Sequence, residues 1–261
     1  MCRTLATLRR ALAPWRTAVA LACCATPLAS CATAVQVPPE GRETVIRSLA
    51  RQSRYLRVAV YVSPFFDDPG RVLLSDRPVE ELAGLQRPDG APLVPPPPRR
   101  VLLPGTPVFV DTVQFPTGAV LWKRSEQTPR RNPWLLAWAD GESRPAVLLL
   151  TADTGRAEDL LAEAGRVLTE DDPTPLFREL PGPQQDAVRR KELLEGMTRA
   201  AVSMAWGFPD RMVIDQASST EEWSWSGGDR RATFQDDRLV RFTRKGASPP
   251  PRSADAAPSG R

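Results

Sequence analysis

The chain has 261 residues, with 35 Lys and Arg, 31 Asp and Glu, four Cys and no His. Without histidine it can form no histidine-based nucleophilic triad, no His general base and no His-ligated zinc site, and we expect no cofactor. Residues 1–30 hold four of the arginines and no acid, so the remainder balances 31 basic against 31 acidic residues and gives no electrostatic reason to expect nucleic acid as a partner.

Residues 1–30 have the three parts of an export signal. The first part is basic, with Arg3, Arg9, Arg10 and Arg16. The apolar run over 18–25 is much shorter than the ~20 residues that span a bilayer, so a transmembrane helix is not expected. Small residues then lead to Cys31. We predict that 1–30 are a signal peptide.

Leu28-Ala29-Ser30-Cys31 resembles the lipobox of bacterial lipoproteins. The resemblance implies cleavage between Ser30 and Cys31 and acylation of Cys31, which anchors the protein to a membrane. Ala32 is not the aspartate that retains many such proteins in the inner membrane, which favours the outer membrane and a body that faces the periplasm. No cysteine follows Cys31, so the mature chain can form no disulfide.

Three other interpretations of the N-terminus are less favoured. An ordinary signal peptide would be cut at a nearby small residue without acylation. Ala22-Cys23 is a poorer lipobox, because Ala20 stands where a larger aliphatic residue is usual. Arg9-Arg10 matches a twin-arginine export signal in only two residues, so we interpret it as a chance pair.

Residues 31–44 read as a tether, followed by a β-rich domain over 45–172. Within it we expect a helix over 42–54, a strand over 56–62 and one or two helical turns over 79–85. Strands are expected over 108–115, with a β-bulge near Asp111, and over 119–123, 134–139 and 146–151. A helix over 157–168 follows, and the proline run over 94–98 is a linker.

The expected fold class is α+β, with a small SH3-like barrel or a bent antiparallel sheet as the first module. The Pro-Gly-Thr-x-Val segment at 104–108 resembles the entry into the first strand of bacterial SH3-like modules. That resemblance implies peptidoglycan as one possible ligand of this half.

Aromatic and basic residues lie close together in one stretch of this module. Trp122, Arg130, Arg131 and Trp134 are the candidate interaction residues. The favoured alternative is structural, namely a pair of strands joined by a charged hairpin.

A second module is expected over 184–246, after a proline-broken linker over 173–183. A helix over 185–194 should end at Gly196, and Thr198 should cap a second helix that ends at Gly207. Strands are expected over 211–215, 221–226 and 230–235, with a return over 239–243. Five aromatic residues should form the core, with Trp223 or Trp225 facing the helices: Trp206, Trp223, Trp225, Phe234 and Phe242. Residues 247–261 have the composition of a disordered tail.

About sixty residues of this module resemble a known family. The residues are Gly196-Met197-Thr198 with Val202, then Trp206-Gly207-Phe208-Pro209-Asp210, then Glu221-Glu222-Trp223, Phe234 and Leu239-Val240. They resemble the α-α-β-β-β domain of SmpA/OmlA-type outer-membrane lipoproteins, which include the small lipoprotein of the β-barrel assembly machinery. The resemblance implies a role in outer-membrane assembly or maintenance.

We therefore expect a lipid-anchored envelope protein that is not an enzyme and that binds other envelope proteins. The alternative is a peptidoglycan-binding anchor that uses the SH3-like half. An enzyme is disfavoured, because His and a free Cys are missing and adjacent carboxylates in turns do not face each other across a cleft, as a glycosidase requires.

Overall fold

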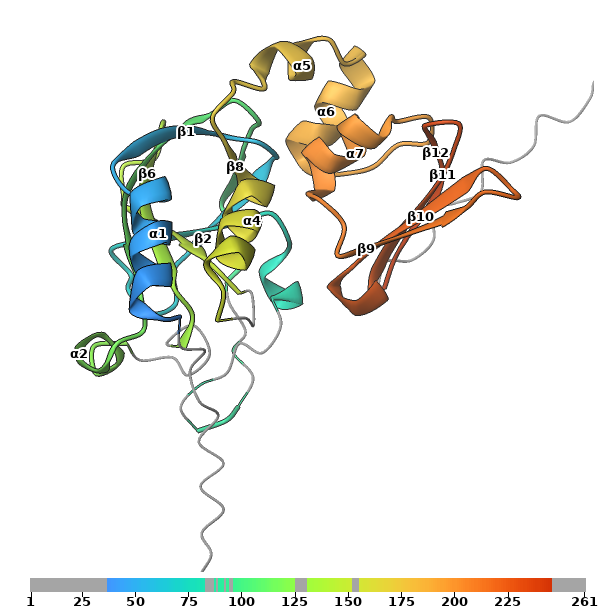
Figure 1. The fold of residues 1–261 in the computed structure, drawn as a ribbon. Helices are drawn as coiled ribbons and strands as arrows, with labels where there is room; N and C mark the ends of the chain where they lie inside the picture. The colour runs from blue at the N-terminus through green and yellow to red at the C-terminus, as the bar shows by residue number, and fades with distance from the viewer. Residues whose placement is uncertain are drawn as a thin grey trace, which may run out of the picture. The chain divides into compact units, whose positions relative to one another are not determined.

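The structure, a computed structural model, describes residues 37–82, 87, 89–91, 93, 96–124, 131–151 and 155–245. In this part the chain is a mixed α+β protein, with a curled sheet, a second smaller sheet and a few helices (Figure 1). The expected α+β class is confirmed at this level. None of the helices in the described part is long and apolar enough to cross a bilayer. The expected signal peptide, lipobox and C-terminal tail lie outside the described residues.

The first sheet has eight strands in the order β4-β2-β3-β7-β6-β5-β1-β8. Their bounds are β1 Gln52–Leu56, β2 Val60–Pro64, β3 Val72–Ser75, β4 Arg100–Leu102, β5 Pro107–Gln114, β6 Trp134–Ala139, β7 Ala146–Leu149 and β8 Leu168–Thr169. Among the strands that the structure describes, only β3 and β7 pair in parallel. Every residue of these two strands is buried, as expected for strands that are covered on both faces.

Two helices, α1 (Pro39–Leu49) and α4 (Ala157–Val167), lie side by side against this sheet (Figure 1). Their apolar faces enter the main core through Val45 and Leu160. The expected tether over 31–44 is therefore shorter than predicted, because Val37 is already buried and Pro39 begins the helix. Proline is well tolerated at the first helical position, where its missing N–H costs no hydrogen bond.

Two predicted strands of the first module are wrong. The strand expected over 56–62 is two strands, because β1 pairs with β5 and β8 whereas β2 pairs with β3 and β4. The segment expected as a strand over 119–123 is the short helix α2 (Gly118–Leu121). A short apolar run does not distinguish strand from helix by its pattern. The predicted bulge is confirmed, since the register of β5 against β6 shifts between Val110 and Thr112.

The C-terminal part is a second layer of helices on a four-stranded meander in the order β12-β11-β10-β9. The bounds are α5 Thr174–Arg178, α6 Gly182–Arg190, α7 Arg199–Trp206, β9 Arg211–Asp215, β10 Thr220–Trp225, β11 Arg230–Gln235 and β12 Arg238–Arg244. Two single 3₁₀ turns, η1 (Val79–Glu81) and η2 (Ser226–Gly228), follow β3 and β10. The predicted helix–helix–sheet order is observed.

The cap and stop signals of α7 are confirmed. The Thr198 hydroxyl accepts a hydrogen bond from the backbone N–H of Ala201 at 3.2 Å, and Gly207 ends the helix with φ 81°. The predicted end of the preceding helix is wrong. It ends at Lys191, which adopts a left-handed conformation, rather than at Gly196. The reason is tertiary, because the Lys191 side chain is held by partners far away in the chain.

The segment over 173–183 is not the simple linker that its prolines predict. It contains α5 and the start of α6, and Phe177 is buried in the same apolar cluster as Trp206. Trp223 and Trp225 are both buried, because residues two apart in a strand point to the same face, so the predicted choice between them does not arise. The rings of Trp206 and Trp225 meet edge to face at 5.5 Å.

Replacing Trp206 by Ala should destabilise the whole C-terminal part. Truncating a buried Trp typically costs ~3–5 kcal/mol, and the Trp206 indole also donates to the Lys191 carbonyl at 3.1 Å. Trp122→Ala is the matched control, because Trp122 is exposed and surface changes stay within ~0.5 kcal/mol. Urea unfolding followed by circular dichroism measures both. Equal loss of stability in the two variants would contradict this assignment of the core.

Candidate functional site

The predicted site residues are only partly described. Ser30, Cys31 and Arg130 lie outside the described residues, and Arg131 is half-buried. Trp122 is 86% exposed at the end of α2, whereas Trp134 in β6 is 4% exposed. The proposed recognition stretch is therefore split between the surface and the interior.

Trp134 belongs to a buried basic–aromatic pair. The Arg124 guanidinium lies 3.7 Å from the centre of the Trp134 indole and donates to the carbonyls of Asn132 at 2.7 Å and Gln114 at 3.0 Å. Burial lowers the pKa of Arg124 to about 10. Trp134 is therefore part of the interior and not available to a partner. The expected alternative, a pair of strands joined by a charged hairpin, is wrong for its first strand, because Trp122 follows the helix α2.

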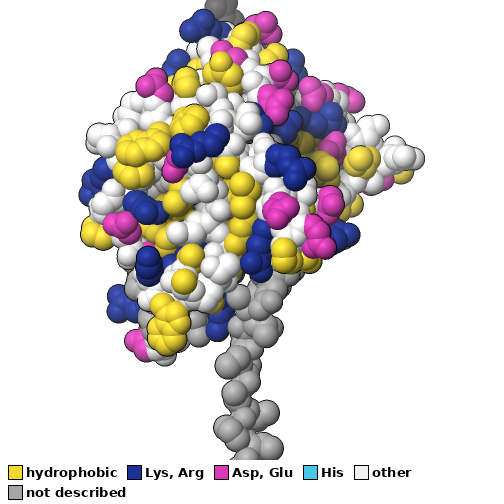
Figure 2. Space-filling view, turned by 60° about the vertical axis from the view of Figure 1, so that its left-hand side comes forward, with side chains coloured by type: hydrophobic (Ala, Val, Ile, Leu, Met, Phe, Trp, Pro, Cys, Tyr) yellow, Lys and Arg dark blue, Asp and Glu magenta, His cyan; other side chains and the backbone are white. Residues whose placement is uncertain are grey.

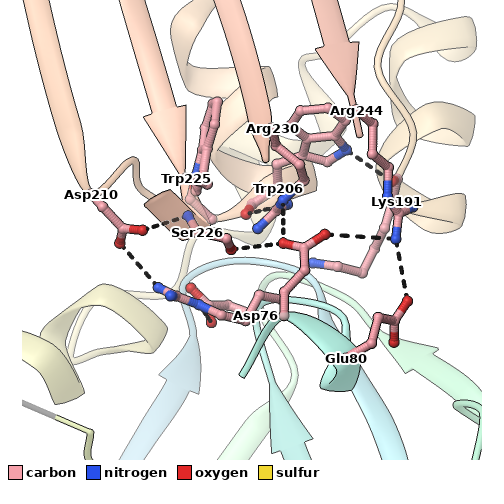
Figure 3. A network of polar contacts seen from close by, with 12 residues as sticks. Asp76, Glu80, Lys191, Trp206, Asp210, Trp225, Ser226, Arg230 and Arg244 are labelled. Atoms are coloured by element: carbon pink, nitrogen blue, oxygen red, sulfur yellow. Dashed lines mark hydrogen bonds and ion pairs between the residues drawn. The ribbon is translucent and has the colours of Figure 1, made fainter. Parts of the chain in front are cut away.

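A network of buried charges, which the sequence did not indicate, links the first sheet to the C-terminal part (Figure 3). At its centre the Arg230 guanidinium, from β11, pairs with the Glu81 carboxylate, from η1, with Nε 2.7 Å from Oε2. The Ser226 hydroxyl donates to the same oxygen at 2.8 Å. Arg230 also lies over the Trp206 ring at 5.0 Å. Burial lowers the pKa of Arg230, and the charge of Glu81 opposes that shift.

Lys191 is the second buried cation of this network. Its ammonium donates to the carbonyls of Ala59 at 2.5 Å and Ala205 at 2.8 Å. Ala205 lies in the last turn of α7, where carbonyls lack helical partners and cations are favoured. Burial lowers the pKa of Lys191 to about 7. This one side chain thus joins the loop before β2 to the end of α7.

Asp210 is the third point of contact. Its carboxylate accepts from Arg77 at 3.2 Å, from Arg166 at 3.1 Å and from the Ser226 backbone N–H at 2.8 Å. Burial alone would raise the pKa of Asp210, but Arg77, the Ser226 N–H and Arg166 outweigh it, so the pKa lies below its usual value. Nearby, a Cβ at Gly207 would come within 2.7 Å of Asp76, so only glycine fits there.

A cavity beside this network is too small for a substrate. Its volume is about 40 Å³, and its polar lining comes from Asp76, Arg77, Glu163 and Arg166. Such a space holds a water molecule or two, well below the ~300 Å³ of ligand pockets. No three His, Cys, Asp or Glu side chains of the described ranges gather where they could bind a metal ion. What the network shows directly is a link, because Arg230 of β11 pairs with Glu81 of η1.

The surface offers a different kind of site. Figure 2 shows one face of the molecule, where hydrophobic side chains form several separate groups with both signs of charge among them. Two exposed apolar features lie on strands. The first is the edge strand β9, where Met212, Val213 and Ile214 are 60%, 47% and 67% exposed. The second is an exposed cross-strand aromatic pair, Phe109 and Trp138.

The sequence already carried a signal for the first feature. Three consecutive apolar residues do not alternate, so they cannot all face the core of a half-buried strand. The strand over 211–215 is predicted correctly from the sequence, but its three apolar residues are not identified there as an exposed site.

No family model, no curated protein and no solved structure matches this chain.

Removing the Glu81 carboxylate should leave the buried Arg230 guanidinium without its ionic partner. Breaking one partner of a buried ion pair costs ~3–5 kcal/mol, so Glu81→Gln should lower the free energy of unfolding by that amount. Glu80→Gln is the neighbouring control, because exposed Glu80 meets Arg244 at 3.5 Å and an exposed pair is worth less than ~1 kcal/mol. Urea unfolding curves compare the two, and similar losses would show that the Arg230–Glu81 pair is not the main link.

The stability of the protein should rise with pH above neutrality. Lys191 has a pKa of about 7 in the folded chain against ~10.4 when unfolded. Between these two pH values the unfolded state therefore binds more protons than the folded state. The free energy of unfolding should then gain ~1.4 kcal/mol per pH unit from this group. Lys191→Met should lose that gradient, and Lys245→Met, at an exposed position, should keep it. A gradient that survives in Lys191→Met would contradict the assignment.

Proposed function

We propose that this protein is a lipid-anchored, non-enzymatic protein of the bacterial cell envelope that acts by binding other envelope proteins. Acylated Cys31 would anchor it in the outer membrane, with its body facing the periplasm. The observation that carries the proposal is Leu28-Ala29-Ser30-Cys31, placed directly after a basic and then an apolar segment. A role in outer-membrane assembly or maintenance follows from the SmpA/OmlA-like resemblance of the C-terminal module.

Lipid physics supports an anchor of this kind. A single acyl chain binds a membrane only marginally, whereas two or more hold a protein stably, and lipoprotein cysteines carry three. Val37 is already part of the folded core. The six residues from Cys31 to Val37 extend at most ~22 Å, so the anchored body would stay near the membrane surface.

Two features of the C-terminal part support a protein partner. Its order of two helices followed by an antiparallel sheet agrees with what the SmpA/OmlA resemblance implies, with one more strand. The exposed apolar strand β9 is the kind of surface that binds another polypeptide, since monomeric proteins rarely leave such edges open.

The alternative is peptidoglycan binding through the first module, which we propose to be SH3-like. The specific observation in its favour is the exposed pair Phe109 and Trp138, whose rings offer apolar faces to a flat ligand. Pull-down from cross-linked membranes, set against sedimentation with purified sacculi, separates the two proposals. Co-sedimentation without a cross-linked protein partner would favour peptidoglycan.

Lipidation is tested directly by labelling. Cys31→Ala should lose labelled fatty acid and remain soluble or unprocessed, because it lacks the acylated thiol. Cys23→Ala is the control for the poorer lipobox and should keep the label. Equal label on Cys31→Ala and the parent would overturn the assignment, and an unlabelled parent would indicate an ordinary signal peptide.

A further inference from the structure

The two edges of the C-terminal sheet differ in how they are protected. Within the described part of the chain, β9 pairs only with β10. β12 pairs with β11, and the start of β12 also contacts the 196–198 segment through a bridge between Arg238 and Thr198 and through backbone hydrogen bonds of Leu239. An edge strand presents unpaired N–H and C=O groups, and proteins usually guard it with charged side chains. β12 carries Arg238, Arg241 and Arg244, whereas all five residues of β9 are exposed and its middle three are apolar.

Pairing of β12 with itself is unfavourable in the symmetric register. Antiparallel pairing about Arg241 sets Arg238 opposite Arg244 and Arg241 opposite its own copy. Like charges directly opposite each other destabilise a strand pair. This edge is therefore protected against a second copy of the chain.

The sequence of β9 has the opposite property. Antiparallel pairing about Val213 sets Arg211 opposite Asp215 twice, Met212 opposite Ile214 twice, and Val213 opposite itself. Opposite charges and apolar residues that face each other stabilise neighbouring strands. We propose that β9 pairs with β9 of a second copy of this chain, antiparallel about Val213, so that the two C-terminal sheets join into one.

Both faces of the joined sheet would be complementary. Met212 and Ile214 lie opposite Trp223 and Glu221 of β10, so they share the face that carries buried Trp223. On this face Met212 and Ile214 would contact the same residues of the second copy and become buried from water. Val213 and the charge pairs would meet on the other face. A slip by one residue would set side chains of opposite faces against each other. A slip by two residues would separate Arg211 from Asp215, so the charge pairs favour the register about Val213.

The charged ends of β9 are available for such a contact. Arg211 has no ion pair with any residue that the structure describes. The Asp215 carboxylate accepts from the Ala217 N–H at 3.0 Å and the Ser218 hydroxyl at 2.7 Å, which orient it. The hydrogen bond from Ser218 also lowers its pKa, so it is ionised at neutral pH.

A contact built on a five-residue strand is small, and small interfaces are weak in solution. Anchoring two copies in one membrane raises their effective concentration without any new contact. The inference therefore rests on the proposed function, and it names a second copy as one of the protein partners.

Cysteine cross-linking tests the register in the whole mature chain. All four natural cysteines lie at or before position 31, so a form that begins at Ala32 contains none. V213C should form a disulfide-linked dimer under mild oxidation, because the two introduced thiols face each other across the symmetry axis. V240C is the control on β12, with 43% exposure against 47% for Val213. Equal cross-linking of both variants, or none in V213C, would overturn the proposal.

Charge reversal provides an independent measurement by sedimentation equilibrium. R211E and D215K should each raise the dimer dissociation constant at least roughly tenfold, because each sets like charges opposite each other. A mixture of the two variants should restore association, since every opposed pair in the mixed dimer is then attractive. Circular dichroism of each variant checks folding. A monomeric parent at the highest attainable concentration, or a mixture that stays monomeric, would contradict the pairing.

Both measurements use the form that begins at Ala32, which has no cysteine to acylate, so they do not depend on the anchor. Loss of the β9 dimer, with cross-linked envelope partners still recovered from membranes, would overturn this inference alone. A β9 dimer in a protein that carries no lipid at Cys31 would support the inference and overturn the proposed anchoring.

Discussion

The buried pair of Arg230 and Glu81 is the interaction on which the described structure depends most. A buried charge without a partner costs several kcal/mol, so two segments far apart in the chain must stay together once both are buried. Lys191 adds a second link of the same kind, because its ammonium reaches carbonyls of the loop before β2 and of α7. Apolar contacts join the same parts, since Ala59 belongs to the C-terminal core. The described residues between 37 and 245 therefore belong to one compact unit, although the sequence suggests two modules and a linker.

This use of charge bears on function. The basic and acidic groups that meet in the interior form ion pairs with one another, and the cavity beside them is small. What is left for a partner is the outer surface, where charges of both signs are mixed (Figure 2). On such a surface an exposed apolar edge strand without protecting charges indicates a binding site more clearly than a patch of charge does. The contrast between β9 and the arginine-rich β12 favours recognition by strand pairing.

A lipid anchor and a weak edge contact support each other physically. Strand pairing through β9 alone buries little surface, and an acylated N-terminus within reach of the membrane would confine copies to two dimensions. Weak association of this kind would be reversible. The same edge would otherwise be a liability for aggregation, and in the proposed pairing the opposed charges of Arg211 and Asp215 would favour one register.

Local signals in the sequence determined much of this protein. The Thr198 cap, the Gly207 stop and the positions of the four C-terminal strands depend on short-range signals, and the structure confirms each of them. The predicted export signal and lipobox rest on the sequence alone, because they lie outside the described residues. Tertiary structure alone decided that Phe177 is core, that Lys191 ends its helix in a left-handed turn, and that Arg230 is buried. Each of these depends on groups that are distant in the chain. Neither the spacing nor the composition of a segment shows which distant carboxylate or carbonyl its charged side chain will contact.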